Sequence, residues 1–131
     1  MVKFGYTILY VSDVTKSIEF YEKSFGFSRK FITPENDYGE LETGQTTIAF
    51  ASKELANSNL KNGFTASQLS QKPFATELGL VTDNVIEIVE HALKFGATIL
   101  EEPLEKPWGQ TVAYIRDLDG FLLEICTPIS N

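Results

Sequence analysis

Apolar and polar side chains alternate along the last third of the chain, over residues 108–126. Two alternating runs flank Asp117-Leu-Asp-Gly120, a sequence typical of a tight β-hairpin turn. Alternation also assigns faces, because successive side chains of a strand point to opposite sides. On the second strand Leu123 and Ile125 share one face and Glu124 lies on the other. Burying an unpartnered carboxylate is costly, so Glu124 is expected to reach water, meet a hydrogen-bond donor or face a cavity.

The rest of the chain shows two similar successions of patterns. The first has a β-rich run, an amphipathic helical stripe and three further strand runs, at residues 6–11, 14–25, 27–32, 38–43 and 46–51. The second has a strand run, a helical stripe, a strand run and the final hairpin, at residues 73–81, 85–95, 97–101 and 108–126. Both successions read β-α-β-β-β.

Capping residues mark the helix ends. Ser12 and Asp13 are both good N-cap residues for the first helix, and Gly26 is in the position of a C-cap glycine. Asn84 is expected to cap the second helix, with Glu87 in the capping-box position and Gly96 at its end.

A polar stretch rich in Ser, Asn, Lys and Gln separates the two patterns at residues 52–72. Residues 52–57 are compatible with a helical turn. At about twenty residues the stretch is long for a compact domain, which suggests either a packed loop or lid, or a solvated linker. We therefore expect a first module at residues 1–51, a connector at 52–72 and a second module at 73–131, together forming one structural domain.

The two modules are also similar in amino-acid sequence. Tyr6-Thr-Ile-Leu-Tyr-Val-Ser-Asp13 lies over Glu77-Leu-Gly-Leu-Val-Thr-Asp-Asn84, and both helices end in Phe-Gly. The repeat period of about 70 residues is too long for a solenoid. It fits an α+β fold of two sheet-plus-helix units, with the helices outside and the sheets curled around a shared groove.

Composition excludes several classes of function. The 131 residues are 43% hydrophobic and 22% charged, as in an ordinary globular protein. The net charge of −7 argues against binding to nucleic acid or to an anionic membrane surface. Cys126 is the single cysteine, which excludes an internal disulfide and a multi-thiolate metal site, and it is interpreted as a small buried hydrophobe. The N-terminus lacks the apolar run of a signal peptide, and no run is long enough to span a bilayer, so a cytoplasmic location is expected.

The repeated order and its motifs resemble the vicinal oxygen chelate superfamily. The resemblance rests on Val11-Ser-Asp-Val-Thr-Lys-Ser-Ile-Glu-Phe-Tyr-Glu-Lys-Ser-Phe-Gly-Phe27 in the first module, and on residues 77–85 and 107–126 in the second. The superfamily contains glyoxalase I, extradiol dioxygenases, fosfomycin-modifying enzymes and bleomycin-binding resistance proteins. The resemblance covers essentially the whole chain and implies a fold of paired βαβββ modules. It does not specify the function, because one scaffold carries many activities.

Metal-using members of this superfamily take their ligands, mostly His and Glu, from four strand positions. Carried over to this chain, those positions are Tyr6, Ala49, Glu77 and Glu124, with the Ala49 position uncertain by one residue. The resemblance thus implies that two carboxylates are kept and that both histidines and one glutamate are lost. Two carboxylates alone suit at best a weak Mg, Mn or Ca site. His91, on the second helix, is expected to be structural or solvated.

Glu77 and Glu124 are expected to project into the same groove. Paired carboxylates do acid–base work when their environments separate their pKa values. The alternative is a polar patch whose carboxylates accept hydrogen bonds from neighbours such as Tyr6, Gln110 or Arg116. No third group that would orient a base is visible in the sequence, and no catalytic residue is assigned.

The same alternation predicts the other residues of the groove. With Glu124 inward, the inward set on the preceding strand is Gln110, Val112, Tyr114 and possibly Arg116, and in the first module it is Tyr6, Ile8, Tyr10, Thr47, Ala49 and Ala51. Trp108 either stacks on a flat ligand or anchors an interface. Arg116, beside Asp117, is alternatively a brace of the hairpin. The candidate ligand-binding residues are Tyr6, Ala49, Glu77, Trp108, Tyr114 and Glu124.

Two functions of different classes remain open. The first is a metal-independent binder of a small aromatic or amphipathic molecule, similar to the antibiotic-sequestering branch, with no cofactor. The second is a metal-dependent lyase or isomerase of the glyoxalase I type, with Glu77 and Glu124 as ligands of a divalent metal. In either case the expected partners are a small molecule and a second copy of the chain in a homodimer.

Overall fold

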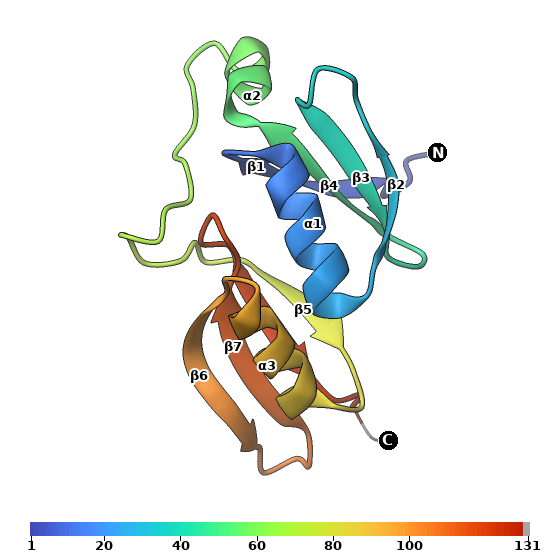
Figure 1. Cartoon of the computed structure of the whole chain (residues 1–131), viewed down its shortest axis with the longest axis vertical. Coiled ribbons are helices and arrows are strands. Elements are labelled where there is room, and N and C mark those ends of the chain that lie inside the picture. Colours follow the sequence, from blue (N-terminus) through green and yellow to red (C-terminus); the bar gives the residue numbers. More distant parts are fainter. Residues whose placement is uncertain (130–131) are drawn as a thin grey trace. The chain divides into compact units, whose positions relative to one another are not determined.

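The computed structural model of the chain describes residues 1–129 (Figure 1). Its elements in chain order are β1 (Tyr6–Val11), α1 (Val14–Phe25), β2 (Ser28–Ile32), β3 (Tyr38–Glu42), β4 (Thr47–Ser52), α2 (Lys53–Asn59), β5 (Glu77–Val81), α3 (Val85–Lys94), β6 (Thr98–Glu105), β7 (Thr111–Arg116) and β8 (Leu122–Cys126). Contacts divide the chain into two compact units, residues 1–66 and the part from Ser67 onward. Each unit holds one βαβββ module, which confirms the predicted α+β fold class.

The sheet of the first module has the strand order β1-β4-β3-β2. The β1–β4 pair is parallel and the other two pairs are antiparallel, so the sheet is mixed. Helix α1 covers one face of it (Figure 1). The fit is close, because a Cβ atom added at Gly39 would lie 2.5 Å from Ile18 Cδ1. The core under the helix contains Leu9, Val11, Val14, Ile18, Tyr21, Leu41 and Phe50, all buried.

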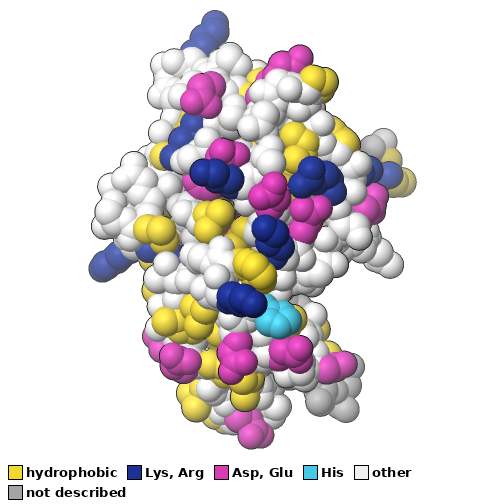
Figure 2. Space-filling model, in the orientation of Figure 1, with side chains coloured by type: hydrophobic (Ala, Val, Ile, Leu, Met, Phe, Trp, Pro, Cys, Tyr) yellow, Lys and Arg dark blue, Asp and Glu magenta, His cyan; other side chains and the backbone are white. Residues whose placement is uncertain are grey.

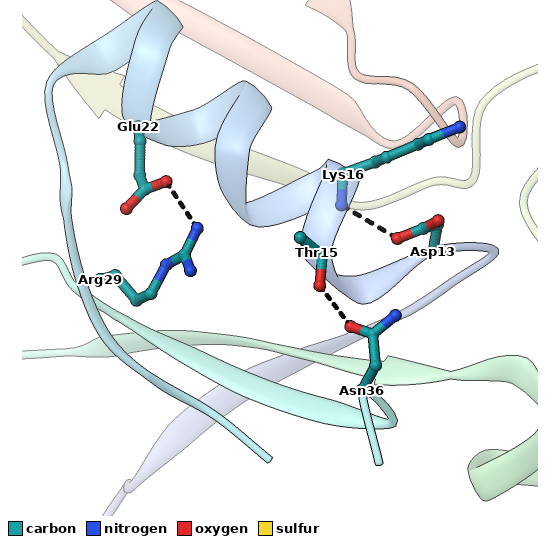
Figure 3. Close-up of polar contacts among 6 residues, drawn as sticks. All are labelled: Asp13, Thr15, Lys16, Glu22, Arg29 and Asn36. Carbon is teal, nitrogen blue, oxygen red and sulfur yellow. Dashed lines mark hydrogen bonds and ion pairs between the residues drawn. The ribbon is translucent and has the colours of Figure 1, made fainter. Parts of the chain in front are cut away.

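Polar contacts lie at both ends of α1, and Figure 3 shows those made by side chains, including the ion pair of Glu22 with Arg29. The Asp13 carboxylate accepts a hydrogen bond from the Lys16 backbone N–H at 3.0 Å, and the Thr15 hydroxyl donates to the Asn36 side-chain oxygen. At the other end Gly26 is left-handed, with φ 76°, and its N–H donates to the Glu22 carbonyl. The caps predicted for this helix are confirmed.

The sheet of the second module repeats this topology, with the strand order β5-β8-β7-β6 and a parallel β5–β8 pair. Helix α3 packs on one face, where Ala113, Ile115, Leu123 and Ile125 have no exposed area. Alternation therefore directs Glu124, Tyr114 and their neighbours to the opposite face, as predicted.

Several boundaries differ from the sequence prediction. Strand β5 begins at Glu77 rather than at residue 73, because Phe74 packs its ring against Phe121 with centroids 6.2 Å apart and the chain joins the ladder only afterwards. Strand β6 continues through Pro103 to Glu105. An edge strand tolerates proline because its outer N–H groups need no partner, and β6 is the edge of its sheet.

Helix α3 is capped differently from the prediction. Asn84 is its N-cap residue, but the side chain caps no backbone N–H and instead donates to the Glu87 carboxylate. The helix ends at Lys94 with Phe95 as C-cap residue, one position before Gly96. In the connector, residues 53–59 form the helix α2, whose N-cap Ser52 accepts a hydrogen bond from Leu55 N–H.

The surface is of mixed charge. On the face drawn in Figure 2, Lys and Arg side chains lie among Asp and Glu side chains. The histidine, His91, is exposed, in agreement with the solvated role expected for it. Within residues 1–129, no helix combines the length and the apolar character needed to cross a bilayer.

Candidate functional site

The candidate site of the second module lies on the sheet face that α3 leaves uncovered. Glu124 on β8 is in register with Gly79 on β5 and with Tyr114 on β7. Glu77 lies two residues before Gly79 and therefore shares this face. Three adjacent strands thus bring Glu77, Glu124 and Tyr114 together. Next to them, a Cβ atom added at Gly79 would meet no described atom within 4 Å, so the space beside Glu124 is open.

The two carboxyl groups interact directly. Hydrogen bonding to Glu124, followed by partial burial and the negative charge of Glu124, raises the pKa of Glu77 to about 7. Two carboxylates at close range resist simultaneous ionisation, so the pair retains a shared proton up to about neutral pH. The pair is therefore able both to accept and to donate a hydrogen bond at neutral pH.

Tyr114 and Cys126 border the pair. Burial, together with the negative charges of Glu124, Glu77 and Cys126, raises the pKa of Tyr114. Burial, followed by hydrogen bonding to Glu124 and the charges of both glutamates, raises the pKa of Cys126 to about 11, while Gln110 opposes the shift. The Cys126 thiol is thus protonated at neutral pH and is not an activated nucleophile. Its burial agrees with the prediction of a small buried hydrophobe.

Trp108 lies in the turn between β6 and β7 of the same module, and 62% of its surface is exposed. Its indole N–H donates to the Gln110 side-chain oxygen at 2.8 Å, and the Gln110 side-chain amide donates to the Thr127 carbonyl at 2.8 Å. Gln110 is buried and fixes the orientation of the indole. The exposed ring is available either to a flat ligand or to another surface, the two roles that the sequence left open.

Arg116 does not donate to the glutamate pair. Its guanidinium donates to four backbone carbonyls, at 2.9 Å to Gly120, 2.9 Å to Gln68, 3.4 Å to Leu69 and 2.7 Å to Gln71. The suggestion that Arg116 supplies hydrogen bonds to the carboxylates is therefore wrong, whereas its role as a brace of the hairpin turn is confirmed by the Gly120 contact.

The remaining candidate positions belong to the first module. Tyr6 and Ala49 lie on the sheet face opposite α1, since Tyr6 is in register with Thr47, two residues before Ala49. Tyr6 is 52% exposed, but Ala49 has no exposed area. Ala49 is thus in place as part of the floor of this face, without surface of its own to offer a ligand.

The sequence interpretation missed two residues on this face, Tyr38 and Glu40. Glu40 is in register with Ala49, accepts a hydrogen bond from the Tyr38 hydroxyl at 2.7 Å and pairs with Lys30 at 3.6 Å. Burial, then hydrogen bonding to Glu40 and its charge, raises the pKa of Tyr38. The alternation of Tyr38-Gly-Glu-Leu-Glu42 was the available signal, because Gly39 and Leu41 face the helix.

The side chains at Tyr6, Ala49, Glu77 and Glu124 do not fit the histidine and glutamate metal site that the fold suggests. Alanine stands at position 49 and has no side-chain donor atom. Among residues 1–129, no three His, Cys, Asp or Glu side chains come together in an arrangement able to hold an ion. A catalytic zinc site normally uses three protein ligands.

Comparison with known proteins agrees with this architecture. Residues 3–125 match the profile of the Glyoxalase/Bleomycin resistance protein/Dioxygenase superfamily. Virulence protein STM3117 of Salmonella typhimurium is 30% identical over 127 residues, covering 94% of this chain and 82% of that protein. Lactoylglutathione lyase GLX1 of Arabidopsis thaliana is 28% identical over 131 residues, and the match covers 94% of this chain but 43% of that enzyme.

Solved structures share the fold. The crystal structure of a glyoxalase-related enzyme from Fulvimarina pelagi superposes with a TM-score of 0.82 at 18% identity, covering 98% of this chain and 89% of that one. A glyoxalase/bleomycin resistance protein/dioxygenase family enzyme from Burkholderia phytofirmans gives a TM-score of 0.78 at 21% identity, covering 96% and 98%. The repeated βαβββ modules, their mixed four-stranded sheets and the match over nearly the whole sequence show that this chain belongs to the Glyoxalase/Bleomycin resistance protein/Dioxygenase superfamily.

Proposed function

We propose that the protein binds a small amphipathic or aromatic molecule without a metal, on the sheet face that carries Glu77 and Glu124. The observation that carries the proposal is the composition of this face, where a proton-sharing carboxyl pair stands beside open space at Gly79. Such a pair recognises a ligand group that donates hydrogen bonds, because at least one carboxyl oxygen is always available to accept them.

An apolar row adjoins the carboxyl pair on the same face. Val81, Cys126, Val112 and Leu104 are in register across the four strands, two residues along from the Glu124 row. Val81 is 64% exposed and Leu104 is 61% exposed, although both are apolar. A ligand with a polar head near Glu124 and an apolar body over this row would cover both kinds of surface, which is the usual composition of a small-molecule site.

The exposed indole of Trp108 also supports a binder. Trp108 is the single tryptophan, so its fluorescence reports on events at this end of the module. Its ring is exposed and its N–H is already held by Gln110, which leaves the aromatic face free to stack.

A thermal-shift screen tests the proposal, using aromatic amines alongside matched neutral and carboxylate analogues. We expect the amines to raise the melting temperature most, and Trp108 fluorescence to change saturably on titration. Glu124→Gln should weaken binding about tenfold or more, the effect of losing a charge-assisted hydrogen bond. Glu90→Gln, an exposed change on α3, is the matched control and should leave affinity unchanged. Equal affinity of wild type and Glu124→Gln would refute the proposed ligand head.

The second candidate function is a metal-dependent lyase or isomerase of the glyoxalase I type, with Glu77 and Glu124 among its ligands. The retention of carboxylates at both second-module positions favours it. Elemental analysis of protein purified without chelators, repeated after incubation with Zn, Ni, Mn and Fe, separates the two functions. Binding without metal predicts no stoichiometric metal, whereas about one ion per chain and turnover abolished by chelators would establish the enzyme.

A further inference from the structure

The guanidinium of Arg116 occupies an unusual place for a charged group. Arg116 is only 5% exposed, and its four hydrogen bonds all go to backbone carbonyl oxygens rather than to a carboxylate. Three of these carbonyls belong to residues 68–71, the last part of the polar connector, which we call the strap. The fourth belongs to Gly120 in the β7–β8 turn. Arginine suits such a contact because its rigid fork presents five donors at once.

The strap also packs tightly on the turn. A Cβ atom added at Gly120 would lie 2.7 Å from Arg116 Nη2, 3.1 Å from the Gln68 carbonyl carbon and 3.2 Å from the Leu69 nitrogen. Past the strap, the ring of Phe74 contacts that of Phe121, with centroids 6.2 Å apart. The chain is therefore held at two successive points before β5 begins at Glu77.

Sheet register places the strap relative to the candidate site. Arg116 is in register with Leu122, and Leu122 with Glu77. Arg116 and Tyr114 lie two residues apart on β7, so both belong to the face that carries the carboxyl pair. The strap thus lies at the end of this face where Glu77 stands, about two strand spacings or 10 Å across from β5.

We infer that Arg116 is a positioning residue that fixes the strap as a permanent wall at the Glu77 end of the face. The wall function rests on the proposed small-molecule binding, whereas the clamping of the strap by Arg116 does not. The C-terminal part of the connector is therefore a fixed wall and not a lid. The strap limits how far a ligand extends past Glu77, whereas it sets no limit in the direction of Val81 and Leu104.

Two turns of the connector provide a matched comparison in the unaltered protein. The Gln71 N–H donates to the Gln68 carbonyl at 3.1 Å, inside the strap, and the Gly63 N–H donates to the Leu60 carbonyl at 3.0 Å, outside it. The two turns have similar hydrogen bonds, and only the first is clamped. We expect the Gln71 amide to exchange with solvent at least about tenfold more slowly than the Gly63 amide. Equal exchange would overturn the clamp.

Arg116→Lys tests the clamp by substitution. The variant keeps the positive charge, but a single ammonium cannot reach four carbonyls. Limited chymotrypsin digestion, with cleavage sites read by mass spectrometry, compares the bond after Leu69 with the bond after Leu60, whose residues are 47% and 40% exposed. We expect cleavage after Leu69 to become about tenfold faster in the variant, the effect of losing charge-assisted hydrogen bonds, and cleavage after Leu60 to stay unchanged.

Arg29→Met, which removes an exposed ion pair with Glu22, is the control and should leave the digestion pattern unchanged. Equally faster cleavage after Leu60 and after Leu69 in Arg116→Lys would show a general loss of stability and would refute the local clamp.

Ligand affinity tests the wall. For an amine identified in the screen, Arg116→Lys should bind the parent compound severalfold more weakly, and an analogue extended at its polar end should lose less. Equal losses for both compounds would refute the wall. A screen that yields no ligand would instead refute the proposed function, while digestion and amide exchange would still decide the clamp.

Discussion

At the scale of single residues, the Glu77–Glu124 pair determines what the second-module face can do. The pKa of Glu77, raised from 4.5 to about 7 chiefly by its hydrogen bond to Glu124, means that the folded protein binds a proton more tightly than the unfolded chain. Between these two pH values the folded state therefore carries more protons than the unfolded state. By linkage, this contribution to the free energy of unfolding is fully present below about pH 4.5 and is lost as the pH rises through about 7.

The upward shift of the Glu77 pKa predicts how Glu77→Gln changes stability. Glutamine resembles the protonated carboxyl, so the substitution should leave the melting temperature nearly unchanged at pH 5 and raise it at pH 8, where the wild type carries two negative charges side by side. Thermal unfolding at both pH values measures the effect. Glu90→Gln, on the exposed surface of α3, should show no such difference between the two pH values. A stabilisation of the same size at pH 5 would contradict the shared proton.

Gly120 and Gly109 form a second residue-scale test. Both have positive φ, 92° and 95°, so alanine at either position carries a backbone penalty of about 1–2 kcal/mol. Only at Gly120 does the added Cβ also meet Arg116 and the strap, whereas at Gly109 no described atom lies within 4 Å. Gly120→Ala should therefore lower the free energy of unfolding clearly more than Gly109→Ala, measured by denaturant titration. Equal losses would show that the strap does not pack against the turn.

At the scale of elements, the helices show how far local sequence reaches. The apolar stripe of α1 and its capping residues predicted the helix and both of its ends correctly, because capping depends on neighbours within one turn. The α3 cap was predicted from the same residue types, yet Asn84 turned to Glu87 instead of to the backbone. Side chains with several donors and acceptors choose among partners of similar energy, and sequence spacing does not rank them.

The two caps consequently predict different responses to truncation. Asp13→Ala removes a hydrogen bond to the Lys16 N–H and should cost about 1 kcal/mol of stability. Asn84→Ala removes no side-chain bond to a backbone N–H of α3 and should cost less. Chemical denaturation of both variants provides the comparison. A larger loss for Asn84→Ala would mean that its side chain caps the helix in solution.

At the scale of the whole molecule, each unit leaves apolar surface uncovered. In the first unit Phe4, Tyr6 and Ile8 are 68%, 52% and 37% exposed, and β1 is an edge strand of its sheet. Exposed apolar edges are places where chains associate, because their backbone groups and side chains both lack partners.

This surface supports the homodimer expected from the sequence. Light scattering coupled to size exclusion should give about twice the chain mass of 14.6 kDa. Tyr6→Lys, which places a charge on the exposed edge, should shift the mass toward that of one chain, whereas Lys3→Glu outside the strand should not. A single-chain mass for the wild type at all concentrations would contradict the dimer.

The sequence by itself determined the repeated βαβββ order, the family and the side of each strand that faces a helix, since periods of 2 and 3.6 and the residues at helix ends are local properties. It also singled out Glu124 through the alternation of the last strand, and Glu77 through the resemblance to the superfamily. Tertiary structure alone decided that the Glu77 and Glu124 carboxyls share a proton and that Arg116 binds backbone carbonyls of the strap. Those pairings join strands and loops distant in sequence, and their geometry depends on sheet register and packing, which no local pattern encodes.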